Sequence, residues 1–171
     1  MRHNQAVNKL SKFLAYVLGR QPDEFGLLPD ADGYVKIKDL MKALHEEPGW
    51  RHVRSGHLRE AIYTISSPAV EMEGKLIRAT DRSRMIIPKM ANAVPKLLFH
   101  PIRQRAYPVI IQNGLDAHHP TSCIVMAAEK DFAQRLGRRI DPSPVILTVN
   151  TATACKNGAT MWQLGSKQNF Y

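Results

Sequence analysis

The hydrophobic pattern of the chain changes near its middle, and this change limits the fold more than any single motif. In the first half, apolar residues recur at helical spacing in the run that ends at Gly19, and stretches 38–47 and 55–65 repeat this period. A short strand around Val35 and an alternating hairpin over 69–79 complete this half. In the second half, short apolar strands alternate with helices. The sequence therefore predicts an α+β fold with two lobes.

The order helix, strand, helix, helix, hairpin is typical of a winged-helix lobe, and an ordinary small α+β lobe is the alternative. Residues 80–96 are rich in Pro, Ser and basic residues, and we expect them to connect the lobes. In the second lobe, Gly114 and Gly137 are each expected to end a helix. The expected elements there are helices at 106–115 and 129–137, and strands at 96–100, 122–128, 144–150 (buried) and 158–165.

The composition favours an anionic partner. The formal net charge is +9, and both halves carry more Lys and Arg than Asp and Glu, as expected for a protein that binds nucleic acid or nucleotide. Cys123 and Cys155 form no CxxC or zinc spacing, so we expect two reduced thiols. There is no apolar signal core and no run of membrane-spanning length, which predicts a cytoplasmic protein without membrane contact.

Several catalytic motifs are absent from the sequence. It has no Walker loop, GxGxxG, HExxH or GxSxG, and His118-His119 would point to opposite sides of an extended chain, so no metal site is expected. What remains is a set of basic residues at element ends. Each has a structural alternative: a favourable charge at a helix C-terminus, a solvated hairpin residue, or a structural histidine. These residues are Arg20, Arg78, His100, Arg138 and Arg139.

Six stretches follow one another along almost the whole chain. They are SKFLAYVLGRQPDEFGL, DADGYVKIKDLMKAL, KLIRATDRS, LLFHPI, IIQNGL and FAQRLGRRIDPSPVILTVN. In this order and spacing, the chain resembles the KptA-type RNA 2'-phosphotransferases. The resemblance implies a winged-helix-like RNA-binding lobe at 1–82, a connection at 83–95, and an ADP-ribosyltransferase-like NAD-binding lobe at 96–171, with a cleft between the lobes.

The resemblance also implies a reaction. In this family an internal RNA 2'-phosphate attacks C1 of the NAD ribose, and nicotinamide leaves. A neighbouring ribose hydroxyl then attacks the phosphate, which frees the RNA 2'-hydroxyl and yields ADP-ribose cyclic phosphate. Such chemistry needs cations that bring two polyanions together and stabilise charge on the transferring phosphate. The resemblance therefore implies NAD and RNA as partners and a role in tRNA splicing. We also expect a monomer.

Site residues follow from the resemblance position by position. It implies catalytic roles for Arg20, Arg78 and Arg139, with Arg138 as the alternative to Arg139 at the fourth basic position. It also implies NAD contacts for His100 and Arg138. Arginine suits this task because one guanidinium can bind two phosphate oxygens.

The chain departs from the family motifs at functional positions. Gly19 and Arg20 stand where the family has an Arg-His pair, and Pro101-Ile102 replaces Gly-Thr. Residues 123–127 replace His-Val-His-Leu-Ser, and 82–84 replace Gly-His-Ser. Two alternatives therefore stay open. One is a divergent ADP-ribosyltransferase acting on another nucleic-acid or phosphate acceptor. The other is a catalytically inactive RNA- or DNA-binding paralogue.

Overall fold

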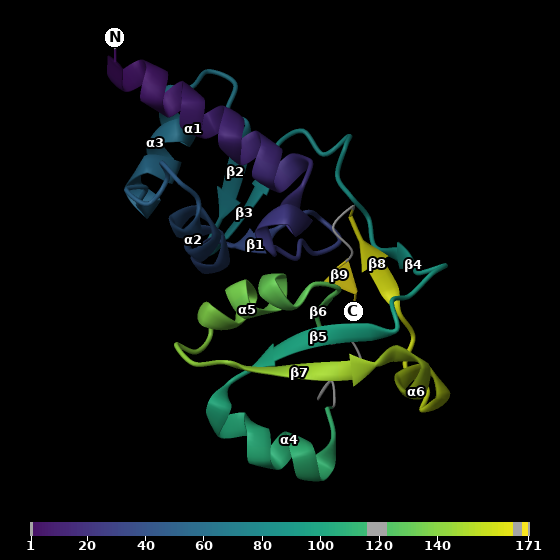
Figure 1. Cartoon of the computed structure of the whole chain (residues 1–171). Helices are drawn as coiled ribbons and strands as arrows, with labels where there is room; N and C mark the ends of the chain where they lie inside the picture. The colour runs from purple at the N-terminus through teal and green to yellow at the C-terminus, as the bar shows by residue number, and fades with distance from the viewer. Residues whose placement is uncertain (1, 116–122, 166–168, 171) are drawn as a thin grey trace. The chain divides into compact units, whose positions relative to one another are not determined.

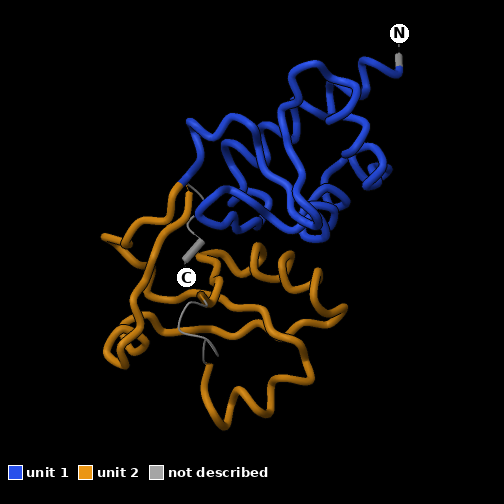
Figure 2. The backbone as a smooth tube through the Cα atoms, turned by 180° about the vertical axis from the view of Figure 1, so that it is seen from behind, with its two compact units in different colours: residues 1–86 blue, residues 87–171 orange. Residues whose placement is uncertain are grey.

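The structure is a computed structural model that describes residues 2–115, 123–165 and 169–170. The chain divides into two compact units, Met1–Ile86 (unit 1) and Ile87–Tyr171 (unit 2), coloured blue and orange in Figure 2. Both units combine helices with antiparallel strands, as the predicted α+β class requires. Among the described residues, no helix is long and apolar enough to cross a membrane.

Unit 1 contains the three helices that the hydrophobic period predicts (Figure 1). They are α1 (Arg2–Gly19), α2 (Ile37–Glu46) and α3 (Ser55–Thr64), and the short 3₁₀ helix η1 (Pro22–Phe25) follows α1. The predicted apolar stripe of α1 is buried in the core of this unit. Ser55 is the first residue of α3, and Arg54 is its N-cap residue, whose backbone N–H donates to His57 Nδ1.

The unit 1 sheet has the order β1-β3-β2 and is antiparallel throughout. Its strands are β1 (Val35–Lys36), β2 (Val70–Glu73) and β3 (Leu76–Ala79). The predicted hairpin is confirmed, with its turn at Gly74-Lys75 because Glu73 pairs with Leu76. The first strand is shorter than expected, since Ile37 already begins α2. The core between helices and sheet includes Leu14, Leu40, Leu58 and Ile77.

Among its described residues, unit 2 is built on a six-stranded sheet in the order β4-β8-β9-β6-β5-β7. The longest pairing joins β5 and β7, from Leu97↔Asn150 to Ile102↔Val145. The strands are β4 (Lys89–Met90), β5 (Leu97–Ile102), β6 (Met126–Ala127), β7 (Val145–Asn150), β8 (Trp162–Leu164) and β9 (Asn169–Phe170). The helices are η2 (Gln104–Ala106), α4 (Tyr107–Asn113), α5 (Lys130–Arg138) and α6 (Thr151–Lys156).

Several strand predictions in unit 2 need correction. Part of the expected connection is strand β4, whose residues Lys89 and Met90 pair with β8. The strand expected at 122–128 is reduced to β6 among the described residues. Strand β7 is half-exposed rather than buried, because it is paired on one side only among the described strands. Helix α6 was not predicted; Asn150 caps it by accepting the Thr153 N–H.

The two glycines expected to end helices behave differently. Gly114 follows α4 with a φ of 82°, a conformation that favours glycine, so this prediction is confirmed. Gly137 lies inside α5, and Arg139 follows the helix instead. A Cβ at residue 137 would lie 2.8 Å from Pro144 and 3.0 Å from Pro101. Glycine is therefore needed here for close packing of α5 against β5, not for a turn.

We expect Gly137→Ala to lower the free energy of unfolding by about 1–3 kcal/mol, because the new methyl group overlaps two rigid proline rings. Gly56→Ala in α3 is the matched control. A Cβ there meets nothing within 4 Å, so we expect a gain of about 0.5–1 kcal/mol. Urea unfolding followed by circular dichroism measures both. Unchanged stability of the Gly137→Ala variant would contradict the packing role.

Candidate functional site

A pocket of about 310 Å³ lies at the C-terminal end of α1 in unit 1. Three segments far apart in the sequence form it: the last turn of α1, residues 67–69 before β2, and residues 80–84 after β3. Its lining residues are Ala15, Gly19, Arg20, Ser67, Pro68, Ala69, Thr80, Asp81 and Arg84. The fold thus places the predicted site residue Arg20 at the edge of a concave surface.

Close packing at Gly19 brings these segments together. A Cβ on Gly19 would lie 3.0 Å from the Asp81 carbonyl oxygen and 3.1 Å from the Ala79 Cβ. A side chain at this position would push the helix away from the exit of β3. The absence of a side chain at residue 19 therefore lets Arg20 and Asp81 line one pocket.

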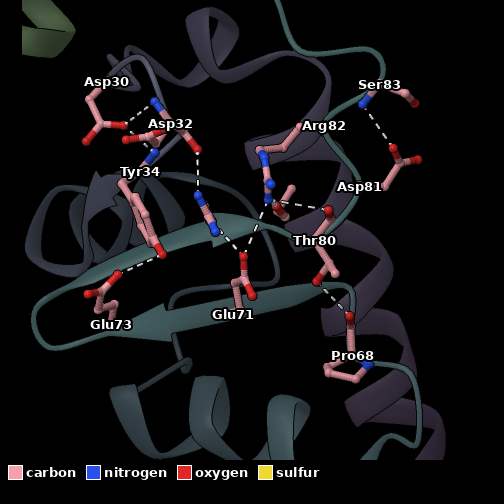
Figure 3. Close-up of polar contacts among 12 residues, drawn as sticks. Asp30, Asp32, Tyr34, Pro68, Glu71, Glu73, Thr80, Asp81, Arg82 and Ser83 are labelled. Carbon is pink, nitrogen blue, oxygen red and sulfur yellow. Dashed lines mark hydrogen bonds and ion pairs between the residues drawn. The ribbon is translucent and has the colours of Figure 1, made fainter.

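Hydrogen bonds fix the two chain segments opposite α1. The Thr80 hydroxyl donates to the Pro68 carbonyl at 2.8 Å, and the Thr80 N–H donates to the Ala69 carbonyl at 2.9 Å. Asp81 Oδ1 accepts the Ser83 N–H at 3.0 Å, as Figure 3 shows. The polar groups of the pocket are thus held by local backbone contacts, so a ligand meets a wall that is already formed.

The pocket carries two guanidinium groups and one carboxylate. Hydrogen bonds from Ser83 hold the pKa of Asp81 below its usual value, and the positive charges of Arg84 and Arg20 lower it further. Both arginines are exposed, so their charges face solvent at the pocket. Two cations beside one ionised carboxylate can bind an anion with more than one negative charge. Asp81 adds an acceptor for a hydroxyl group of the same ligand.

Arg78 belongs to a different set of contacts on the unit 1 sheet. Its Nε donates to Glu71 Oε1 at 2.6 Å, and its Nη1 donates to the Asp32 carbonyl at 3.2 Å. Its guanidinium also lies 4.3 Å from the ring centre of Tyr34. The side chain is only 21% exposed, so the solvated-hairpin alternative is wrong. Arg78 is not among the residues that line the Arg20 pocket.

His100 lies on β5 of unit 2 and is held by one hydrogen bond. Its Nδ1 is 2.6 Å from the Val125 carbonyl oxygen, which can only accept, so Nδ1 carries the proton. Burial lowers the pKa of His100 below 6.5, and the bond to Val125 opposes part of this shift. The neutral ring therefore keeps Nε2 as a hydrogen-bond acceptor.

Arg138 and Arg139 lie at the C-terminal end of α5. Arg138 is exposed and Arg139 is half-buried. The structure thus brings Arg20 together with Arg84, and Arg138 together with Arg139. His118-His119 lie outside the described residues, and within the described part no group of three His, Cys, Asp or Glu is arranged for a metal ion.

Sequence reasoning missed Arg84 and Asp81. Both lie in the segment that was interpreted as a connection between lobes, directly after the hairpin. The signal was the density of charged and hydroxyl residues in TDRSR, which follows a strand as a functional loop often does.

Comparisons with known proteins agree over most of the chain. The family model described as "RNA 2'-phosphotransferase, Tpt1 / KptA family" matches residues 4–169. A protein of Acetivibrio thermocellus named "Probable RNA 2'-phosphotransferase" is 32% identical over 88% of this chain and 84% of its own length. A Bacillus thuringiensis protein of the same name is 30% identical over 98% of this chain and 91% of its own. A Thermococcus kodakarensis protein with that name is 26% identical over 92% of this chain and 87% of its own length.

The contacts of Arg78 predict a structural contribution from this residue. Arg78→Ala leaves Glu71 with the longer contact to Arg82, at 3.4 Å, and removes the donor to the Asp32 carbonyl. We expect its melting temperature to fall clearly below that of Arg20→Ala, whose side chain is exposed. Differential scanning calorimetry compares the two. Equal melting temperatures would show that the Glu71 ion pair adds nothing to stability.

The lowered pKa of His100 predicts a pH dependence of stability. The folded protein binds this proton less readily than the unfolded chain, whose histidine titrates near 6.5. The contribution of neutral His100 to the free energy of unfolding is therefore fully present above pH 6.5. This contribution decreases as the pH falls from 6.5 toward the lowered pKa of the folded protein. His100→Asn keeps an N–H donor for Val125 but cannot titrate, so its free energy of unfolding should fall less over this range. Urea titrations at each pH measure the free energy of unfolding of both proteins. If the values for wild type and His100→Asn fell in parallel, this expectation would be refuted.

Proposed function

Because this chain belongs to the RNA 2'-phosphotransferase family described as Tpt1 / KptA, we propose that it transfers an internal RNA 2'-phosphate to ADP-ribose derived from NAD, with release of nicotinamide. One observation carries the RNA side of the proposal. Arg20 and Arg84 line the same pocket as Asp81, and both positive charges act on this carboxylate. This arrangement suits a phosphate next to a ribose hydroxyl.

In this proposal the two guanidinium groups bind oxygens of the 2'-phosphate. Paired N–H donors match phosphate geometry and stabilise charge that grows during transfer. Ser67 adds a hydroxyl donor, whereas Thr80 already donates to the Pro68 carbonyl and so shapes the wall. Asp81 accepts from a ribose hydroxyl and keeps both arginines at the pocket when no ligand is bound.

Arg78 enters the proposal as a third catalytic cation. Glu71 and the Asp32 carbonyl fix two of its donors, and the ring of Tyr34 lies against its guanidinium. An arginine held in this way loses little freedom when a phosphate approaches.

Unit 2 supplies residues whose chemistry fits NAD. The neutral His100 offers Nε2 as an acceptor for a ribose hydroxyl, and Arg138 and Arg139 carry positive charge for phosphate oxygens. When bound, NAD supplies the ribose carbon that receives the phosphate. Among the residues named, Arg139 is the one proposed to act on the reacting groups, and His100 and Arg138 are proposed to bind the dinucleotide.

The finer organisation is part of the same proposal. Residues 1–82 act as a winged-helix-like lobe that binds RNA, and residues 96–171 as an ADP-ribosyltransferase-like lobe, connected by 83–95. The order of helices, strand and hairpin in unit 1 supports the first assignment. We further propose a cytoplasmic monomer that acts in tRNA splicing.

A second candidate function is ADP-ribosyl transfer to RNA without the later phosphate transfer. One observation favours it: Arg20 lines the pocket, and the resemblance places a histidine at this position of the sequence. A guanidinium stays protonated near neutral pH and so cannot exchange a proton as an imidazole does. The second chemical step would be the one affected.

We expect Arg20→Gln and Arg84→Gln each to lower kcat/KM for 2'-phosphate transfer about 100-fold or more, as the loss of a preorganised transition-state donor does. The assay uses NAD and a short RNA with one labelled internal 2'-phosphate. Arg59→Gln, which removes an exposed charge on α3, is the control and should stay within about twofold of wild type.

Three outcomes of the wild-type reaction separate the candidates. Label that moves to ADP-ribose cyclic phosphate supports the proposed transferase. ADP-ribosylated RNA that accumulates supports the second candidate. RNA binding that weakens with salt, without any reaction, supports an inactive binding protein and rejects both enzymatic functions.

A further inference from the structure

The segment between α2 and α3 concentrates positive charge outside the pocket. From Pro48 to Leu58 the sequence has two arginines and two histidines, and it has no acidic residue. Lys9 on α1 adds a cation, since its Nζ lies 5.7 Å from the ring centre of Trp50 in this segment. The basic residues, all exposed, are Lys9, Arg51, His52, Arg54 and His57, and together we name them the α2–α3 cationic surface.

The base of this surface is rigid. The ring of Trp50 stacks on Phe13 of α1, with ring centres 4.6 Å apart and planes 3° from parallel. Val53 is buried in the core, and its N–H donates to the Trp50 carbonyl at 3.0 Å. The segment is therefore anchored at two points, and the cations between them project from a fixed backbone.

Arg54 holds the segment to the start of α3. Its Nη1 donates to the carbonyl groups of Arg51 and Val53, both at 3.0 Å. Its backbone N–H donates to His57 Nδ1 at 3.0 Å, so the ring proton of His57 lies on Nε2, where it can donate to a ligand. The rings of His52 and His57 are 6.1 Å apart, which places two further nitrogen-bearing groups side by side.

Acidic residues flank this surface along the chain but do not lie within the segment. Glu46 and Glu47 come directly before Pro48, and Glu60, the first acidic residue after the segment, is hydrogen bonded to His3. Exposed lysine, arginine and histidine side chains on a rigid base, without acidic residues within the segment, suit a regular row of phosphates. A compact anion would instead need the paired donors and concave wall that the Arg20 pocket has.

We infer that the α2–α3 cationic surface binds the phosphate backbone of the RNA strand, away from the nucleotide that carries the 2'-phosphate. This inference rests on the proposed function for the identity of the polyanion. Contacts of this kind depend on charge rather than on base sequence. Lys9, Arg51 and the two histidines contact phosphates, and Arg54 positions the segment.

The test compares Lys9→Gln/Arg51→Gln with Lys130→Gln/Lys156→Gln, which removes two exposed lysines from unit 2. Arg54 is left unchanged because it holds the segment. Fluorescence anisotropy measures the Kd of the full-length protein for labelled RNA of about 20 nucleotides, with and without one internal 2'-phosphate, at several salt concentrations.

We expect the first variant to bind both RNAs roughly 10- to 30-fold more weakly at about 0.1 M salt, and its log Kd–log salt slope to fall by about 1.4, or 0.7 per lost phosphate contact. The control should change Kd by less than about threefold. Equal losses in both variants would overturn the inference, since they would report net charge alone. If the double variant has a lowered melting temperature, Lys9→Gln and Arg51→Gln are measured separately. The inference then predicts that each lowers the log Kd–log salt slope by about 0.7.

The two RNAs also separate this inference from the proposed function. The α2–α3 cationic surface acts on both RNAs alike, whereas the Arg20 pocket acts on the 2'-phosphate. Loss of affinity for plain RNA, together with wild-type protein that neither prefers nor processes the 2'-phosphate, would support the surface and reject the transferase. A loss confined to the 2'-phosphorylated RNA would reject the surface.

Discussion

The absence of a side chain at Gly19 is the constraint on which the candidate site depends. Because a Cβ there would lie 3.0 Å from the Asp81 carbonyl oxygen, α1 and the chain leaving β3 touch backbone to backbone. This contact lets Arg20, the first residue after the helix, share a pocket with Asp81 and Arg84. The resemblance places an arginine at residue 19 and a histidine at residue 20. In this chain the cation stands one position later, and a second cation comes from the segment after the hairpin.

The arginines of unit 1 have different uses because their neighbours differ. Arg78 and Arg82 share Glu71 as a partner, and Arg78 also holds the hairpin to the loop that contains Asp32, so much of their donor capacity serves the fold. Arg20 and Arg84 are exposed beside the carboxylate of Asp81, and Arg51 and Lys9 are exposed on the α2–α3 cationic surface. The positive charge of this unit therefore divides into three groups: arginines that hold the hairpin, among them the proposed catalytic residue Arg78; a pocket for which a phosphate is proposed; and a surface for which an RNA strand is proposed.

Regular periodicity allowed much of the fold to be predicted from sequence. The helices α1, α2 and α3 and the hairpin were predicted because their apolar residues repeat at regular spacing over ten or more positions. The helix end at Gly114 was predicted because the positive φ of a helix-ending glycine has a local cause. The role of Gly137 depends instead on packing against Pro101 and Pro144, which no local pattern around Gly137 indicates. The same limit applies to the site. Arg20 was found at a helix end, but Arg84 joins it only through packing of α1 on β3, and strand β4 forms only by pairing with β8.

The central claim is that the pocket at the end of α1 binds a phosphate carried on the 2'-oxygen of RNA. The most direct measurement is an NMR titration of the ¹⁵N-labelled protein with a dinucleotide that bears one 2'-phosphate, set against the same dinucleotide without it. The claim predicts chemical-shift changes that occur only with the dinucleotide that bears the 2'-phosphate. They should affect the side-chain Nε–H signals of Arg20 and Arg84 and the backbone amide signals of Thr80 and Ser67. Identical shifts with both dinucleotides, or 2'-phosphate-dependent shifts that leave these four residues unchanged, would contradict it.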